Sequence, residues 1–137
     1  VEDTKLKVNH WFTVDSLDHL HRGGRLSATS AAFGTALKIK PILIVDNEGK
    51  LIPKDKVRGR QKSINALSQE LKSRIVNPEE QIVFISHGDC IEEAEQLKQL
   101  VLSKVNVKDI IINYLGPVIG AHTGPGLLCI AFIGNCR

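Results

Sequence analysis

The sequence lacks several features, and each absence excludes a class of protein. No apolar run approaches the ~20 residues that a membrane-spanning helix needs, and the first residues, 1–5, lack the basic and then apolar layout of a signal peptide. The three cysteines, Cys90, Cys129 and Cys136, form neither a metal-ligand pair nor an even-numbered disulfide framework. We therefore expect a soluble protein of a reducing compartment, the cytoplasm, without membrane insertion.

Methionine is absent altogether, even from position 1. A complete translation product begins with methionine, so we expect this chain to be a piece of a longer protein. Aromatic residues make up only 4% of the 137 residues, and an interior of aliphatic residues favours a sheet covered by helices. The length fits one domain. The net charge of +3 is spread along the chain, which does not indicate a nucleic-acid surface.

Hydrophobic periodicity predicts an α/β domain. Short apolar runs predict core strands over residues 40–45, 81–86, 108–115 and 127–133, and a hairpin partner over residues 51–53. Helical spacing predicts helices over residues 16–24, 27–37, 54–75 and 90–104. Strand, helix and strand after residue 81 form a βαβ unit. We expect a mixed, mainly parallel sheet with a hairpin, flanked by helices.

The most unusual segment, residues 115–126, contains four glycines, two prolines, His122 and Thr123. Glycines let a backbone approach a ligand closely and point N–H groups toward an anion. Imidazole and hydroxyl groups add donors there. A plain turn with a satisfied histidine explains the segment about equally well. Turn formers between two strands place His122 in an exposed connection at a sheet edge.

Two basic features are weaker signals. Arg25 follows a glycine pair and can clamp an anion or a carboxylate of a partner, although a solvated arginine is the simpler explanation. A basic cluster follows on the helix predicted over 54–75, with Arg58 and Arg60 on different faces. Such a run is usually a solvated face. Docking to an acidic partner is an alternative, and nucleic-acid binding ranks last because no aromatic residues lie among the charges.

His87 and Asp89 follow a predicted strand at its carboxyl end, where sites of α/β proteins lie. Together with His122 they suggest a metal-dependent or acid–base enzyme. Residues 89–92, however, have the spacing of a capping box, which makes Asp89 a helix cap rather than a ligand. Core packing is the preferred role of Cys90.

Four segments in succession resemble signatures of the DegV family. They are residues 16–27, 37–43, 56–60 and 116–126, in an order and spacing that run from about Phe12 to Gly134. The last segment, which contains His122-Thr123-Gly124-Pro125-Gly126, is the most specific. Residues 87–89 resemble the His-Ala-Asp of the family, with Gly88 as a departure.

This resemblance implies a two-domain bacterial protein that holds one long-chain fatty acid between its domains. Some members are the acyl-carrying subunit of a fatty-acid kinase and present the carboxylate to a separate kinase subunit. Residues 1–137 then form the carboxy-terminal domain, and a serine and threonine loop of the amino-terminal domain completes the site.

The resemblance also implies roles for single residues. His122 and Thr123 bind the carboxylate. The acyl chain is lined by Phe33, Leu37 and Ile39, and the kinase docks on Arg25, Arg58 and Arg60. We expect no catalytic residue, cofactor or metal in this chain. The alternative that stays open is an enzyme that uses His87, Asp89 and His122.

Overall fold

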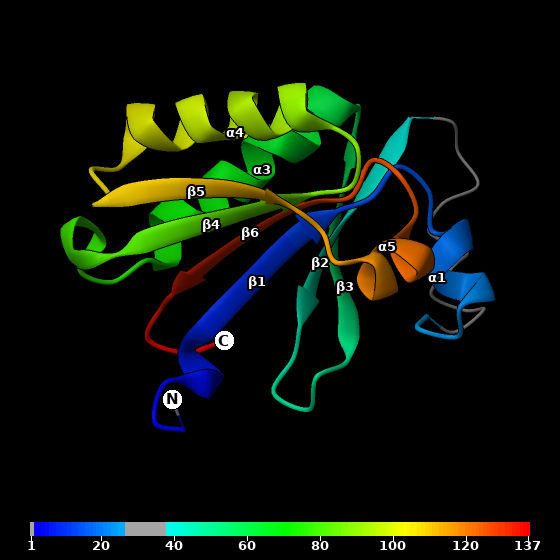
Figure 1. Cartoon of the computed structure of the whole chain (residues 1–137), viewed down its shortest axis with the longest axis horizontal. Helices are drawn as coiled ribbons and strands as arrows, with labels where there is room; N and C mark the ends of the chain where they lie inside the picture. The colour runs from blue at the N-terminus through cyan, green and yellow to red at the C-terminus, as the bar shows by residue number, and fades with distance from the viewer. Residues whose placement is uncertain (1, 27–37) are drawn as a thin grey trace.

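The computed structural model describes residues 2–26 and 38–137. Within these residues one sheet (Figure 1) contains the strands β1 Val8–Thr13, β2 Ile39–Val45, β3 Leu51–Arg58, β4 Ile82–His87, β5 Asp109–Tyr114 and β6 Leu128–Ile133. The helices are α1 Asp18–Arg22, α3 Arg60–Arg74, α4 Ile91–Lys104 and α5 Pro117–Thr123, with short 3-10 turns η1 Lys5–Lys7 and η3 Pro78–Glu80. The helix predicted over 27–37 lies outside the described residues. None of the described helices is long and apolar enough to cross a membrane.

The strand order is β3-β2-β1-β6-β4-β5. Only β4 and β5 pair in parallel, and the other neighbouring pairs are antiparallel. The mixed α/β class and the hairpin are confirmed, but the prediction of a mainly parallel sheet is wrong. There are two causes: β1, which is not predicted from the sequence, enters the middle of the sheet antiparallel to both of its neighbours, and β6 runs antiparallel to β4.

The boundary between β3 and α3 also differs from the prediction. Residues 54–58 continue β3, with Val57 opposite Lys40 in the hairpin, whereas the sequence predicts a helix from residue 54. Gly59, at φ +97°, separates the strand from α3. Charged side chains on this outer strand protect an exposed sheet edge from pairing with another chain. The inference that Arg58 and Arg60 share one helix is therefore wrong.

One face of the sheet is covered by α3 and α4 (Figure 1). On α4, Ala94, Leu97 and Val101 are buried at the spacing of one helical stripe, as predicted. Leu67 and Leu71 do the same on α3. These side chains form the main core with inward residues of the strands. The predicted core strand over 108–115 is β5 at the edge of the sheet, where mainly Ile110 is buried.

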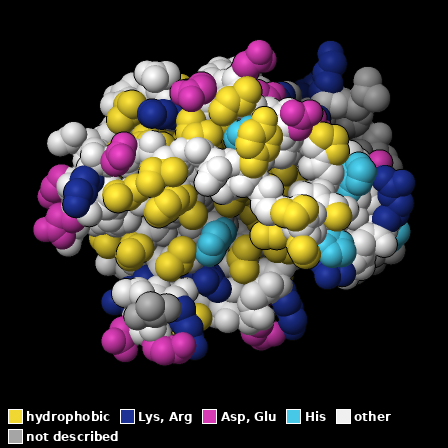
Figure 2. All heavy atoms as spheres, viewed as in Figure 1, with side chains coloured by type: hydrophobic (Ala, Val, Ile, Leu, Met, Phe, Trp, Pro, Cys, Tyr) yellow, Lys and Arg dark blue, Asp and Glu magenta, His cyan; other side chains and the backbone are white. Residues whose placement is uncertain are grey.

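The opposite face is covered only in part by the described residues. A smaller cluster that includes Phe12, Leu20 and Leu127 lies at the end near α1 and α5. Elsewhere on this face Phe84 remains 49% exposed, and Ile82 and Ile111 are also exposed. Figure 2 shows hydrophobic side chains gathered over the middle of the molecule, with most charged side chains toward the margins.

Candidate functional site

An apolar cavity of about 550 Å³ lies on this second face of the sheet. Its floor comes from alternate residues of β1 and β6, such as Phe12, Cys129 and Ala131, whose neighbours along each strand point into the main core. One end is closed by α1 and α5. The lining residues from these helices and the segments around them are Leu20, Arg25, Tyr114, Leu115, Gly116, Val118, Ile119, His122, Thr123 and Leu127.

The glycine-rich segment forms a helix rather than the predicted open connection. Pro117 occupies the first turn of α5, a position that its fixed φ favours. Gly124, at φ +73°, ends the helix. His122 lies in the last turn, is half-buried and lines the cavity. A Cβ on Gly23 would come within 2.7 Å of Nδ1 of His122, so the end of α1 must carry a glycine for the imidazole to fit.

Thr123 is only 4% exposed. Its Oγ1 donates a hydrogen bond of 3.0 Å to the backbone oxygen of Ile119, one turn earlier in α5. The hydroxyl proton is therefore engaged inside the helix. Thr123 lines the cavity beside His122, but it can donate to a ligand only after the hydroxyl turns.

The segment after Thr123 is fixed by backbone contacts. Gly126 donates a hydrogen bond of 2.6 Å to the oxygen of Gly88, and Gly88 donates one of 2.9 Å to the oxygen of Leu127. Gly126 has φ +85°, and a Cβ there would collide with the carboxyl group of Asp15. Glycine is required at this position by both the backbone conformation and the space.

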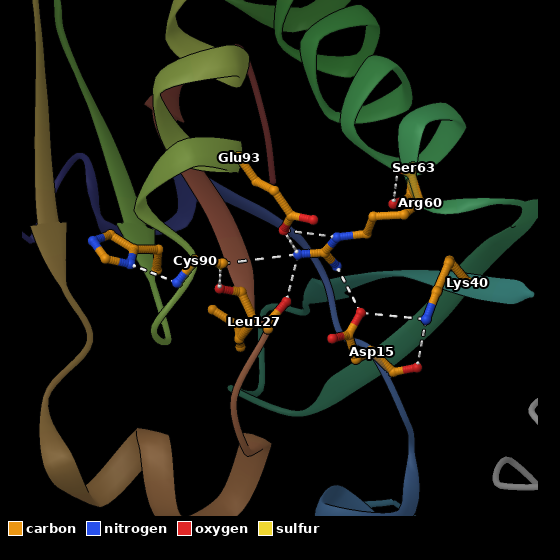
Figure 3. A network of polar contacts seen from close by, with 9 residues as sticks. Asp15, Lys40, Arg60, Ser63, Cys90, Glu93 and Leu127 are labelled. Carbon is orange, nitrogen blue, oxygen red and sulfur yellow. Dashed lines mark hydrogen bonds and ion pairs between the residues drawn. The ribbon is translucent and has the colours of Figure 1, made fainter.

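Arg60 lies in a polar network beside this segment (Figure 3). Its Nε donates a hydrogen bond of 2.9 Å to Oε2 of Glu93, and Nη2 donates to the same oxygen and to the backbone oxygen of Gly126. Nη1 lies 3.7 Å from Oδ1 of Asp15 and makes no hydrogen bond to a described residue. Lys40 Nζ donates to the backbone oxygen and Oδ1 of Asp15, at 3.0 and 3.3 Å.

The residues expected to dock a partner differ in their surroundings. Arg60 is 17% exposed, and its guanidinium forms an ion pair with Glu93 of the same chain. Arg25 is exposed at the cavity, where Nη1 donates a hydrogen bond of 2.6 Å to the oxygen of Gly23. Arg58 is exposed at the end of β3. Docking through Arg25 and Arg58 stays a prediction.

Of the three residues expected to line the acyl chain, only Ile39 lies within the described part of the chain. Phe33 and Leu37 lie outside the described residues. Ile39 is half-buried at the start of β2 and is not among the described lining residues, so its role stays a prediction. Sequence reasoning missed Phe12, because β1 was not expected. It also missed Val118 and Ile119, although two adjacent large apolar residues inside a glycine-rich segment are a usable signal.

His87 and Asp89 are arranged differently from the prediction. His87 is fully buried, its Nδ1 accepts a hydrogen bond of 3.2 Å from the N–H of Cys90, and its ring lies 4.4 Å from that of Tyr114. Asp89 is exposed at φ +55°, and α4 has no side-chain cap. The predicted capping box is therefore wrong, because Cys90 is the N-cap of α4 and Asp89 lies one residue before it, in left-handed backbone. Among the described residues no group of three His, Cys, Asp or Glu could hold a metal ion.

Cys90 has the environment of a packing residue. Its Sγ lies 3.3 Å from the backbone oxygen of Leu127. Burial raises the pKa of this thiol to about 11, against the opposing charge of Arg60. Burial alone raises the pKa of Cys129, on the cavity floor, to about 12.

A family model described as an uncharacterised protein of the DegV family matches residues 1–135. This chain belongs to the DegV family. A DegV domain-containing protein of Clostridium perfringens is 54% identical over 137 residues, which are 100% of this chain and 47% of that protein. The chain thus spans about half the length of this relative.

Solved DegV structures share the fold. A fatty acid binding DegV family protein of Streptococcus agalactiae superposes with a TM-score of 0.84 at 31% identity, over 98% of this chain and 47% of that one. The fatty acid kinase B3 protein of Streptococcus pneumoniae, loaded with linoleic acid, superposes with a TM-score of 0.83 over 98% of this chain and 47% of its own. At 20% identity this second likeness shows the fold alone.

Proposed function

We propose that this chain binds a long-chain fatty acid as one half of a two-domain site and holds the carboxylate for phosphorylation by a separate kinase subunit. The observation that carries the proposal is the apolar cavity of about 550 Å³ that ends at His122. The S. agalactiae DegV protein, similar to this chain at 31% identity, is described as fatty acid binding, which supports the same ligand class here.

The size of the cavity suits an acyl chain. Ligand pockets usually enclose about 300–1,000 Å³, and the second described pocket, between Trp11 and Arg74, holds only about 100 Å³. Burying methylenes contributes ~0.8 kcal/mol each, so a chain of about 16 carbons has a gross drive near ~12 kcal/mol. Ordering the chain and losing its free motion offset part of that drive.

The carboxylate needs donors, because a half-buried anion without partners is costly. Imidazole carries at least one N–H in either protonation state, and His122 is the side chain at the helical end of the cavity that provides it. Thr123 is the second expected contact, provided that its hydroxyl turns away from Ile119. Donors from an amino-terminal domain complete the set.

The exposed apolar residues on this face support the proposal that another domain covers them. Val118 is 73% exposed, and Phe84, Ile82 and Ile111 continue the apolar surface along β4 and β5. Soluble monomers rarely leave large contiguous apolar patches in water. We propose that the other half of the protein covers this surface and the acyl chain together, in the cytoplasm.

The chemistry belongs to the partner. No glycine-rich phosphate loop followed by Lys and Ser or Thr occurs in the sequence, so the phosphoryl group comes from the kinase subunit. Arg25 and Arg58 are the exposed cations proposed to meet that subunit. No catalytic residue, cofactor, metal, nucleic acid or membrane insertion enters this proposal.

Native mass spectrometry of the full-length protein, followed by extraction of any bound acid, tests the proposal. We expect one long-chain fatty acid per protein, and His122→Ala to weaken binding about tenfold or more, the loss of one hydrogen bond to a charged group. Binding unchanged by His122→Ala refutes the carboxylate site. Stoichiometric zinc or manganese in elemental analysis favours the enzyme alternative instead.

A further inference from the structure

Arg60 was expected on the surface, but its side chain is only 17% exposed and lies behind the proposed carboxylate site. We propose that Arg60 is a positioning residue for fatty-acid carboxylate recognition, because it fixes the segment that follows His122 and Thr123. This proposal rests on the proposed function and adds a residue that does not touch the ligand.

The contacts of Arg60 join parts of the chain that are far apart in sequence. One guanidinium holds Glu93 near the start of α4, the backbone oxygen of Gly126 at 2.6 Å, and the carboxylate of Asp15 between β1 and α1 (Figure 3). With Lys40, the four charged side chains balance formally to zero. Such partners offset the desolvation of a cation that is only 17% exposed.

The segment held by Arg60 begins where the carboxylate site ends. Gly126 is clamped from one side by Nη2 of Arg60 and from another by its own hydrogen bond to Gly88. Thr123 and His122 lie three and four residues earlier, at the end of α5. Since α5 is short, the position of its last turn depends on what holds the chain directly after it.

A lysine cannot replace Arg60 in this arrangement. The planar guanidinium donates from Nε and Nη2 to Glu93 and from Nη2 to Gly126 while Nη1 faces Asp15. Lysine has a single nitrogen on a flexible stem and cannot reach these three directions with fixed geometry. Arg60→Lys therefore keeps the charge but releases Gly126.

The test compares a long-chain fatty acid with the fatty alcohol of equal length, which fills the same cavity without a carboxylate. Both are titrated by displacement of a fluorescent fatty acid from the full-length wild-type protein, from Arg60→Lys and from a control, Lys62→Gln. Lys62 is exposed on the same helix. Thermal unfolding of each variant sets a temperature at which all three are folded.

We expect the wild type to prefer the acid, and Arg60→Lys to bind the acid about tenfold more weakly, as when one hydrogen bond to a charged group is misplaced. Alcohol binding should stay within about twofold, and Lys62→Gln should match the wild type. If Arg60 only stabilises the fold, Arg60→Lys weakens the binding of the acid and of the alcohol equally, and that result overturns the proposal.

The failures of the two proposals can be told apart. If the wild type shows no preference for the acid, carboxylate recognition itself is wrong, and the role of Arg60 falls with it. If the wild type prefers the acid and Arg60→Lys keeps that preference, only the role of Arg60 is wrong. Should Arg60→Lys fail to fold, Glu93→Gln is measured in the same way. A smaller loss of acid preference is expected there, and an unchanged preference overturns the proposal.

Discussion

Replacing Gly126 by alanine tests how closely the segment behind the proposed carboxylate site is packed. Gly126 has φ +85°, and an L-residue in left-handed backbone costs about 1–2 kcal/mol. The new Cβ also meets the carboxyl group of Asp15, whose side chain is 56% exposed. That carboxylate must turn away from Lys40 and Arg60, and losing such ion pairs costs about 0–1 kcal/mol more. We expect the free energy of unfolding to fall by about 1–3 kcal/mol.

Gly49 provides a matched control. It has φ +81°, and no described atom lies within 4 Å of the position that its Cβ would take. Gly49→Ala therefore carries the backbone cost alone, about 1–2 kcal/mol. Urea denaturation gives both values if the slopes agree. Removing the obstacle with Asp15→Gly should restore part of the loss in a double-mutant cycle. Equal losses for the two alanine variants, or no coupling to Asp15, refute the close approach.

Two further outcomes follow from the contacts of single side chains. Thr123→Val removes a hydroxyl whose proton already goes to Ile119, so we expect fatty-acid affinity to fall less than about threefold, against about tenfold or more for His122→Ala. Equal losses in the two variants would show that the hydroxyl turns toward the ligand. A thiol reagent at about pH 8 should modify the exposed Cys136 first, because thiolates are the reactive form and burial holds the pKa of Cys90 at about 11. Because burial raises the pKa of Cys90 from the ordinary 9.0 to about 11, the free energy of unfolding should fall as the pH rises through this range. The Cys90→Ala variant should lack this part of the fall, and an equal dependence of stability on pH in the variant contradicts the reasoning.

The fold could be predicted where periodicity alone decides it. β2, β4, β6 and α4 lie within one or two residues of their predicted bounds, because each is a continuous apolar run or one helical stripe. β1 could not be found in this way, because Asn9 interrupts its apolar pattern. Asn9 can be buried because its side-chain amide donates hydrogen bonds to the backbone oxygens of Lys7 and Cys136. The second of these partners lies at the far end of the chain.

Contacts between segments that are far apart in the sequence also limit what can be predicted about the site. His122 and Thr123 were predicted from a contiguous motif, and both line the cavity. The setting of Arg60 could not be predicted, because its partners Asp15, Glu93 and Gly126 come from three distant segments. The neighbouring charges at residues 54–58 pointed to a helix surface, whereas pairing with β2 made them a strand.

The two faces of the sheet differ: one carries the main core, and the other carries the cavity proposed to bind the ligand. Along β1 and β6, residues such as Trp11 and Ile130 enter the main core beneath α3 and α4, and their neighbours Phe12 and Cys129 face the cavity. Because successive side chains of a strand point to opposite faces, a core built on one face leaves the other face to be shaped for a ligand. α3 and α4 anchor the sheet, and Arg60, at the first turn of α3, reaches from that layer to Gly126 behind His122. If His122 binds the carboxylate as proposed, the position of that site is set from the layer of the domain that carries the main core.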